Sequence, residues 1–468
     1  MAQTDNIRPF GLRDKLGYLF GDFGNDFTFI LSTTILMKFY TDVMGVSAGA
    51  VGAIMMIARF VDAFTDVTMG RICDRSRIQP GKGKFRPWIL RMCIPVAASS
   101  FLIYQSSLAS LPYGVKVAYL FVTYILWGSV FYTSINIPYG SMASAISADP
   151  NDRQSLSTYR SMGATLAGAF IGVLLPVFAF EKVDGAETLI GPRVTAAAGI
   201  FSLLAVACYL LCYFLTTERV APPAAQESRT RTSYLGMLKN AVHSRPLISI
   251  VAATVVMLLA QLTMQNMGGY IFPDYYNTAS AQSVSTIVML VSMFIAAAAA
   301  RPLAARFGKA EVSAVSNAFA AGVSLLTYFL RPKSVWVFVA LQSLGWLGLG
   351  LFTMVSWALI TDVIDDAQIK SGVREDGSIY ALYSFARKLG QAAAAGTTGW
   401  LLTAIGYVPG AQSGQTPEVL SGIFSIATLV PAAGFALLAL VLWLWYPLHK
   451  KQVEDNVAQL TAFRPPQA

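Results

Sequence analysis

The sequence predicts an all-α integral membrane protein with twelve transmembrane helices in two pseudo-symmetric six-helix bundles. Its composition first points to a membrane protein. Hydrophobic residues make up 55% of the 468 residues and charged residues only 13%, about half of the roughly 25% that soluble domains carry. The mean hydropathy is +0.55. A soluble chain this apolar would expose very large hydrophobic patches, so we exclude a soluble fold.

The spacing of the apolar residues predicts the individual helices. Twelve stretches are apolar over about 20 residues, the length at which a helix crosses a bilayer. They cover residues 16–42, 47–70, 88–109, 115–146, 159–180, 194–215, 247–272, 283–304, 312–330, 335–360, 378–405 and 420–446. The longest polar stretch separates six from six. We therefore expect an N-terminal bundle in residues 1–215, a cytoplasmic linker in 216–245, and a C-terminal bundle with a short cytoplasmic tail in 246–468.

The basic residues predict the orientation in the membrane. Most of the 34 Lys and Arg residues lie near the chain ends or in the loops that follow even-numbered spans. Because cytoplasmic loops are enriched in Lys and Arg, we expect both termini in the cytoplasm. The net charge of +9 then follows from topology and gives no reason to expect nucleic acid as a partner.

The sequence lacks the residues that zinc hydrolases, histidine-based catalytic triads and P-loop ATPases require. His243 and His449 are the only histidines, the four cysteines form no CxxC pair, and no P-loop motif occurs. Zinc hydrolysis, histidine-based triads and an ATP pump driven by a P-loop of this chain are therefore excluded. We expect neither an enzyme nor a cofactor.

Two pairs of acidic residues interrupt the first two spans. Asp22 and Asp26 lie four residues apart in the first span, and Asp62 and Asp66 in the second, with Arg59 one turn before Asp62. Residues at i and i+4 share a helix face, and ionisable groups cost a few kcal/mol at membrane depth. Two carboxylates on one face could bind Na⁺, or one of them could carry a proton. A structural salt-bridge network, in which Arg59 neutralises Asp62, is the alternative.

Basic residues also interrupt the eleventh span. Arg387 and Lys388 are adjacent, so only one of them readily faces a central cavity. A basic side chain there could bind sugar hydroxyls or a carboxylate. The alternative is a contact with lipid headgroups.

Two cytoplasmic loops of opposite charge predict a gate. The loop after the second span is basic, and the stretch Asp362–Asp376 before the eleventh span is rich in acidic residues. Salt bridges between the two halves could close the cytoplasmic side. We expect gating or structural roles for Arg59, Arg71, Asp74, Arg75, Asp365 and Asp376.

Eight short segments, in order over nearly the whole chain, carry a family resemblance. They are Gly21–Phe27, Phe39–Val43, Arg59–Asp66, Gly83–Trp88, Asn136–Ser141, Gly372–Gly377, Tyr383–Gly390 and Ile405–Pro409. On these segments the chain resembles the glycoside–pentoside–hexuronide:cation symporter family, the melibiose-permease branch of the major facilitator superfamily. The segment that begins at Asn136 is most similar to the glucuronide and xyloside members. The resemblance implies the major facilitator superfamily fold and cation-coupled sugar transport.

The resemblance also implies roles for single residues. It places the cation at Asp62 and Asp66, with the hydroxyl of Thr133 nearby and Thr65 where melibiose permease has an asparagine ligand. The substrate-binding residues that it implies are Asp26, Tyr132, Asn136, Arg160 and Lys388.

Two departures from melibiose permease concern the choice of sugar. Asn136 stands in place of a sugar-binding aspartate, and Gly140 in place of a nearby tryptophan. Both changes argue against α-galactosides. An asparagine also lacks the negative charge that would repel an anionic uronide, which favours a glucuronide or a β-xyloside.

These observations predict a multi-pass secondary transporter of the bacterial inner membrane. We expect it to import a glycoside, pentoside or hexuronide together with H⁺ or Na⁺ by alternating access. The expected partners are the sugar, the coupling cation and membrane lipid, with the chain acting as a monomer and no metal other than Na⁺ at Asp62 and Asp66. An uncoupled sugar uniporter, or a transporter of lipids or other small molecules with the same fold, is the alternative.

Overall fold

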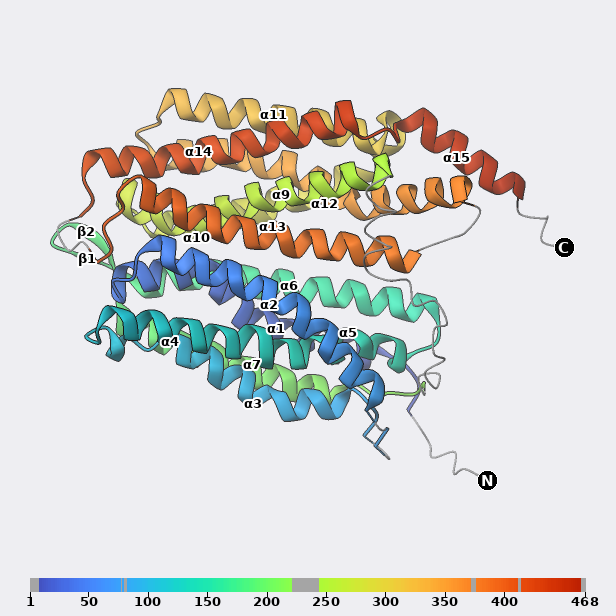
Figure 1. The fold of residues 1–468 in the computed structure, drawn as a ribbon, viewed down its shortest axis with the longest axis horizontal. Helices are drawn as coiled ribbons and strands as arrows, with labels where there is room; N and C mark the ends of the chain where they lie inside the picture. The colour runs from blue at the N-terminus through green and yellow to red at the C-terminus, as the bar shows by residue number, and fades with distance from the viewer. Residues whose placement is uncertain are drawn as a thin grey trace. The chain divides into compact units, whose positions relative to one another are not determined.

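The computed structural model describes residues 8–76, 78–79, 82–220, 244–371, 376–410 and 414–463. Contacts within the chain divide it into two units of helices (Figure 1). Unit 1 contains Met1–Arg229 and Gly406–Gly414, and unit 2 contains Thr230–Ile405 and Gln415–Ala468. The predicted boundaries at residues 215 and 245 remain a prediction, because most of the predicted linker, residues 221–243, lies outside the described residues.

Unit 1 contains six helical rods, coloured blue to green in Figure 1. One rod ends in the π-helical turn η1, and another contains the π-helical turn η3 between two α-helices. In chain order the elements are α1 (Leu12–Lys38), η1 (Phe39–Val43), α2 (Ala48–Arg75), α3 (Arg86–Ile103), the short 3₁₀ turn η2 (Ser106–Leu108), α4 (Tyr113–Ile125), η3 (Leu126–Tyr132), α5 (Thr133–Ile146), α6 (Pro150–Ala179), β1 (Phe180–Val183), β2 (Ala186–Leu189) and α7 (Gly191–Leu215). The strands form an antiparallel hairpin that pairs Phe180 with Leu189.

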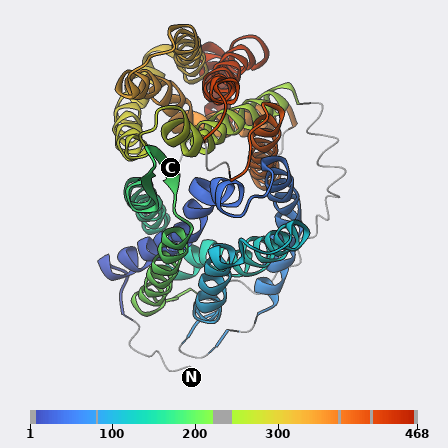
Figure 2. The ribbon, with the colours of Figure 1, turned by 90° about the vertical axis from the view of Figure 1, so that its left-hand side faces the viewer.

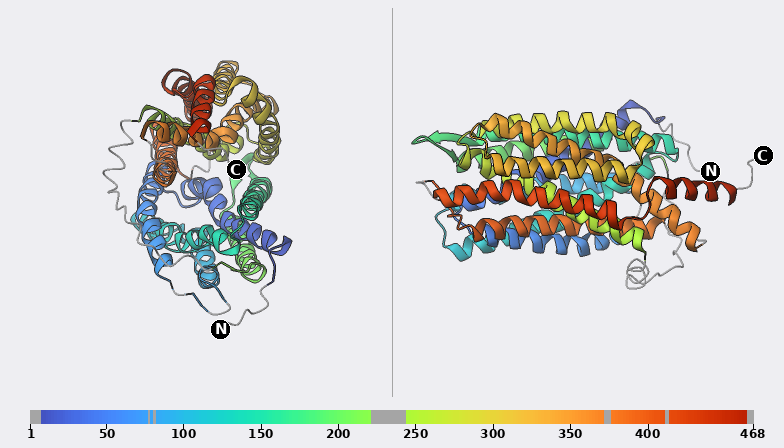
Figure 3. Two further views of the ribbon diagram at one scale, coloured as in Figure 1. Left: turned by 90° about the vertical axis from the view of Figure 1, so that its right-hand side faces the viewer. Right: turned by 90° about the horizontal axis from the view of Figure 1, so that it is seen from above.

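Unit 2 repeats the plan of six rods and adds one helix after them. Its elements are α9 (Arg245–Tyr270), η4 (Ile271–Tyr275), α10 (Ser280–Phe307), α11 (Lys309–Leu330), α12 (Val335–Ser371), α13 (Asp376–Ala404), α14 (Pro417–Leu440), η5 (Val441–Trp445) and α15 (Lys450–Phe463). Figure 2 shows the rods end-on, and Figure 3 shows from the side how the rods of a unit run alongside one another.

Each of the twelve predicted spans corresponds to one of these rods, so the predicted helices are confirmed. Nine of the helices in the described part of the chain are long and apolar enough to cross a membrane by length and composition. The rods α1, α3 and α13 are not among them. Two of these three contain charged candidate residues, Asp22 and Asp26 in α1 and Lys388 in α13. Charged groups lower the mean hydropathy of a span, which explains why these two rods are less apolar. The orientation of the termini remains a prediction.

The same pairs of rods pack together in both units. In unit 1, α1 packs on α6 and α7, α2 on α5, and α3 on α7. In unit 2, α9 packs on α13 and α14, α10 on α12, and α11 on α14. Because these pairs occupy corresponding places in the order of the rods, the two units share one packing plan, as a pseudo-symmetric pair of bundles requires.

Glycine residues allow the closest helix contacts. A Cβ added to Gly163 of α6 would lie 2.5 Å from the carbonyl oxygen of Leu19 in α1. A Cβ added to Gly348 of α12 would likewise lie 2.5 Å from the carbonyl oxygen of Ser316 in α11. Small residues at such crossings let backbones approach, and van der Waals packing then holds membrane helices together.

The residues that follow α7 fold back onto unit 1. Arg219 binds both carboxylate oxygens of buried Asp14, at 2.9 and 3.2 Å, and Arg8 binds the same carboxylate at 2.8 Å. Glu218 accepts three backbone N–H bonds at the start of α3, from Lys84, Phe85 and Arg86, at 2.7–2.9 Å. The described start of the predicted linker is therefore bound to the first bundle.

The loop after α13 also contributes to unit 1. Lys38 Nζ donates to the Tyr407 hydroxyl at 2.9 Å, and that hydroxyl donates to Asp42 Oδ1 at 2.7 Å. Lys38 also pairs with Asp42 Oδ2 at 2.8 Å and is only 2% exposed. The charge of this lysine, which lies inside the first predicted span, is thus neutralised within unit 1.

Candidate functional site

The two carboxylates of α2 are hydrogen-bonded to hydroxyls of the rod that contains α4, η3 and α5. Ser129 Oγ donates to Asp62 Oδ1 at 2.5 Å. One turn further, Thr133 Oγ1 donates to Asp66 Oδ1 at 2.9 Å. Ser129 lies within the π-helical turn η3 and Thr133 directly after it, and such turns occur frequently at functional sites. The structure therefore places Asp62, Asp66 and Thr133 together, as the resemblance implies.

The second oxygen of Asp62 belongs to an ion pair. Arg59 Nη1 lies 3.1 Å from Asp62 Oδ2. The guanidinium of Arg59 also lies over the Phe29 ring, with its central carbon Cζ 5.1 Å from the ring centroid. A weaker bond of 3.5 Å joins Arg59 Nη2 to the Tyr124 hydroxyl. Asp62 is 8% exposed. The salt-bridge interpretation thus holds for Asp62, which is neutralised within unit 1.

Thr65 is bonded to its own helix. Its hydroxyl donates to the carbonyl oxygens of Val61 at 3.3 Å and of Asp62 at 3.2 Å. This hydroxyl lies one residue before Asp66 on α2 and keeps an oxygen lone pair available. Its predicted part in cation binding remains a prediction.

A second polar cluster joins α1 to α6. Asp22 Oδ1 accepts a bond of 3.0 Å from Arg160 Nε, and the Arg160 guanidinium lies 5.3 Å from the ring centroid of Tyr139. Asp26, one turn after Asp22, is half-buried and makes no hydrogen bond or ion pair within the described part of the chain. The cluster thus offers a partly exposed guanidinium and a carboxylate whose oxygens remain available to a ligand.

Tyr132 and Asn136 lie on the same rod. The Tyr132 ring stacks against Phe29 at 5.8 Å between centroids and packs at a tilt on Trp127 at 5.7 Å. Asn136 Oδ1 accepts from Asn25 Nδ2 at 3.4 Å, which connects the α5 asparagine to α1.

Three residues that hydrogen-bond to the candidate residues or to one another were not predicted from the sequence. They are Ser129, which bonds Asp62; Asn25, which bonds Asn136; and Tyr209, which bonds Asn25. Ser129 precedes Thr133 by four residues, a spacing that could have identified it as a second hydroxyl facing α2. Asn25 is adjacent to Asp26, and Tyr209 lies in an apolar helix. Nothing in the local pattern distinguishes either of them from an ordinary packing residue.

The basic candidate residues of α13 belong to unit 2. Lys388 and Arg387 are both half-buried on α13, and the Arg387 guanidinium lies 5.8 Å from the ring centroid of Trp357. The carboxylates of α2 belong to unit 1. The role of Lys388 between a cation site and a sugar site therefore remains a prediction.

The predicted gate residues are partly described. Arg71 and Arg75 are exposed at the end of α2, and Asp365 is half-buried on α12. The side chains of Asp74 and Asp376 lie outside the described residues. In the same acidic stretch, Lys309 pairs with Asp362 at 2.6 Å and Lys370 with Asp366 at 2.7 Å. Both pairs lie within unit 2, and the gate between the halves stays a prediction.

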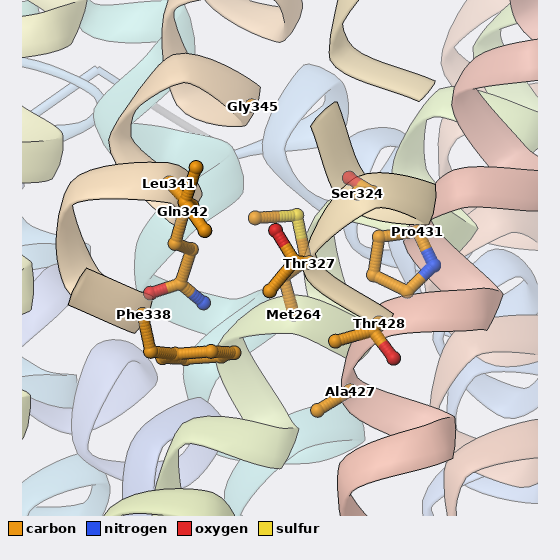
Figure 4. A pocket seen from close by; sticks show the side chains of 10 residues that line it. All are labelled: Met264, Ser324, Thr327, Phe338, Leu341, Gln342, Gly345, Ala427, Thr428 and Pro431. Atoms are coloured by element: carbon orange, nitrogen blue, oxygen red, sulfur yellow. The ribbon is translucent and has the colours of Figure 1, made fainter. Parts of the chain in front are cut away.

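A small cavity lies between α9, α11, α12 and α14 of unit 2. Its volume is about 20 Å³, which is room for about one water molecule. Figure 4 shows Gln342, Thr327 and Thr428 around it, together with Met264. A cavity of this size does not admit a sugar.

Comparison with known proteins decides the family. The sequence profile of the family described as MFS/sugar transport protein matches residues 17–450. The chain belongs to the MFS/sugar transport family. Its members are transporters rather than enzymes, and this chain is a multi-pass protein of the bacterial inner membrane. The resemblance to the melibiose-permease branch of the major facilitator superfamily is confirmed.

Several curated proteins are similar to this family member over almost their whole length. The "Uncharacterized symporter YjmB" of Bacillus subtilis (strain 168) is 31% identical, over 98% of this chain and 97% of that protein. The "Glucuronide carrier protein homolog" of Escherichia coli (strain K12) is 30% identical, over 96% and 95%. The "Putative sulfoquinovose importer" of the same organism is 31% identical, over 94% and 92%.

Solved structures support the fold of this MFS member. A bacterial homologue of the human lysosomal transporter Spinster has a TM-score of 0.65 at 11% identity, over 98% of this chain and 100% of that one. A D-xylose–proton symporter has a TM-score of 0.55 at 16% identity, over 93% and 97%. At these identities the similarity shows the fold alone.

Proposed function

We propose that the chain is a symporter that imports an anionic sugar, such as a hexuronide, together with H⁺ or Na⁺. The observation that carries the proposal is the double contact between α2 and the η3–α5 segment, Ser129 to Asp62 and Thr133 to Asp66. Carboxylate and hydroxyl oxygens are the ligands that hard cations prefer.

The contacts of this cluster favour a monovalent cation. Arg59 pairs with Asp62 at 3.1 Å, whereas Asp66 accepts a hydrogen bond from the Thr133 hydroxyl. The carboxylate and hydroxyl oxygens at Asp66 suit a single H⁺ or Na⁺. A neutral cluster costs less to hold at membrane depth while the carrier changes conformation. We therefore place the cation mainly at Asp66 and Thr133, with Asp62 as a second oxygen ligand.

The guanidinium of the second cluster supports a sugar with a negatively charged substituent, although Asp22, Asp26 and Arg160 together sum to one negative charge. Arg160 supplies a guanidinium on a side chain that is 40% exposed although it is paired with Asp22. Guanidinium groups bind carboxylates and sulfonates through parallel N–H bonds. Asp26 supplies acceptors for sugar hydroxyls. Two similar proteins are named for glucuronide and for sulfoquinovose, both of which are anionic sugars.

Coupling to a cation would supply the driving force. One charge moving through 100 mV releases about 2.3 kcal/mol, which corresponds to roughly fifty-fold accumulation. We infer that binding of the cation neutralises the α2 carboxylates and allows alternating access with the sugar bound. The chain would act as a monomer, because the residues that bind cation and sugar belong to one polypeptide.

The Arg59–Asp62 ion pair also supports a second candidate, an uncoupled uniporter. If this ion pair is permanent and the α2 cluster binds no cation, the sugar moves without coupling. Uptake into proteoliposomes of the purified full-length chain distinguishes the two, with labelled glucuronide, β-xyloside and α-galactoside under imposed Na⁺ or pH gradients. The symporter accumulates sugar above its outside concentration only when a cation gradient is present.

The variants Asp66→Asn and Asp62→Asn sharpen this test. We expect Asp66→Asn to equilibrate the sugar without accumulating it. Asp62→Asn should weaken accumulation less, because Asp66 and Thr133, the main ligands in the proposal, remain in place. If Asp66→Asn accumulates sugar as well as wild type does, the assigned cation site is wrong. If wild type itself never accumulates sugar, the chain is a uniporter.

A further inference from the structure

Asn136 is connected to two buried residues that have no assigned role. The Tyr209 hydroxyl on α7 donates to Asn25 Oδ1 on α1 at 2.9 Å. Asn25 Nδ2 in turn donates to Asn136 Oδ1 on α5 at 3.4 Å. Tyr209 and Asn25 are each 1% exposed, whereas Asn136 is half-buried. Two hydrogen bonds thus connect α7 through α1 to the candidate sugar site.

The order of donors and acceptors determines which end of the Asn136 amide stays available. A primary amide accepts through its oxygen and donates through its nitrogen. Because Tyr209 donates to the Asn25 oxygen, Asn25 presents its NH₂ group to Asn136, and Asn136 accepts with its own oxygen. The Asn136 NH₂ group has no hydrogen-bond partner among the residues that the structure describes. It is therefore the donor that remains for a ligand.

The Arg160 guanidinium lies close to this donor. Gly140 follows Asn136 by one helical turn and so shares its face of α5. A Cβ added to Gly140 would lie 3.8 Å from Arg160 Nη1, so that nitrogen lies beside the glycine. Arg160 binds Asp22 through Nε only, at 3.0 Å. An amide donor and the Nη donors thus lie about one turn apart on one side of the helix.

We propose that Tyr209 and Asn25 are positioning residues that orient the Asn136 amide as a donor, so that the site selects sugars with an anionic, acceptor-rich substituent. This inference rests on the proposed transport of sugar. A carboxylate or a sulfonate accepts from both the amide and the guanidinium. A neutral hydroxyl both donates and accepts, so it tolerates either orientation of the amide. Losing the orientation should therefore weaken binding of anionic sugars selectively.

The test measures KM and Vmax of the full-length chain in proteoliposomes for methyl β-glucuronide, sulfoquinovose and methyl β-glucoside. Tyr209→Phe keeps the ring and removes the hydroxyl. We expect it to raise the KM for the anionic sugars by roughly 3- to 10-fold, the value of one net hydrogen bond. Vmax and the KM for methyl β-glucoside should stay within about twofold. Tyr213→Phe, one turn further along α7, is the matched control and should change neither KM.

A double-mutant cycle separates positioning from a general structural role. In an Asn136→Ala background, Tyr209→Phe should raise the KM no further, because its effect passes through Asn136. Asn25→Ala should reproduce the Tyr209→Phe result and provides a second test if the tyrosine variant folds poorly. Equal increases for anionic and neutral sugars, or additive effects in the double mutant, would overturn the inference.

The wild-type measurement distinguishes this inference from the proposed function. A wild type that transports none of the three sugars overturns both. A wild type that transports an anionic sugar, together with a Tyr209→Phe variant of unchanged KM, overturns only the positioning role. The glucuronide and sulfoquinovose arms show whether the preferred anion is a carboxylate or a sulfonate.

Discussion

Thr133 donates its hydroxyl to Asp66 at 2.9 Å, across the contact between α5 and α2. The bond lies one turn beyond the Ser129–Asp62 bond, so the two helices present a row of alternating hydroxyl and carboxylate groups. In the proposed function, such a row supplies several oxygen ligands to the cation, and the two hydrogen bonds hold these oxygens in place. The chemistry of the proposed site therefore depends on neutral hydroxyls as much as on the two acids.

Replacing Thr133 tests this dependence. Thr133→Val keeps the shape of the side chain and removes the hydroxyl, so we expect the cation concentration for half-maximal sugar uptake to rise roughly 5- to 10-fold. Thr133→Ser should stay within about twofold of wild type. Ser134→Ala is a suitable control, because the Ser134 hydroxyl bonds its own helix at Val130. Equal cation dependence in Thr133→Val and wild type would count against Thr133 as a ligand.

The Arg59–Asp62 pair should dominate the local stability. Arg59→Gln leaves Asp62 charged, 8% exposed and without its 3.1 Å partner, and removing one partner of a buried pair costs about 3–5 kcal/mol. We expect a marked drop in the thermal unfolding temperature of the purified protein, and partial recovery in Arg59→Gln/Asp62→Asn. Ser129→Ala should cost less, about 1–3 kcal/mol, because it leaves one carboxylate oxygen unsatisfied. A double variant no more stable than Arg59→Gln would refute this account.

The crossing of α6 over α1 should not tolerate a larger residue at Gly163. A Cβ there would lie 2.5 Å from a main-chain oxygen, which cannot move as a flexible side chain can. We expect Gly163→Ala to reduce stability by about 1–3 kcal/mol, as overpacking does, measured by thermal unfolding in detergent. Gly114→Ala is the control, since its Cβ would meet nothing within 4 Å. Similar unfolding temperatures for the two variants would contradict the close contact.

Glu218 should protect the start of α3 from hydrogen exchange. Its carboxylate accepts from three successive amides at 2.7–2.9 Å, and an acidic group at a helix N-terminus is stabilised by the helix dipole. Glu218→Gln keeps one acceptor but loses the charge. We expect faster exchange in a peptide covering residues 84–88, measured by mass spectrometry. Glu454→Gln, at an exposed pair 3.9 Å from Lys450, should leave that peptide unchanged. Unaltered exchange in Glu218→Gln would argue against the cap.

Much of the architecture could be predicted from the amino-acid pattern. A bilayer requires about 20 apolar residues per helix, and that requirement locates twelve rods, because only helices and closed barrels satisfy the backbone in lipid and the apolar stretches are too long for barrel strands. The same reasoning locates Asp26, Asp62, Asp66 and Lys388 as candidates, because an ionisable group at membrane depth is costly. The i,i+4 spacing also shows correctly that the acids of each pair share a face.

The partners of these groups could not be predicted in the same way. Asp62 and Asp66 are equivalent in the linear pattern, yet Asp62 pairs with Arg59 and Ser129 whereas Asp66 binds Thr133. Asn25 and Tyr209 have no distinguishing pattern in the sequence, and their hydrogen bonds form only because α1, α5 and α7 pack together. Hydropathy and spacing report the cost of placing a group in lipid, which is a property of each residue. The rotation and register of neighbouring helices determine which atoms meet, and these depend on the packing of many small contacts along each whole rod.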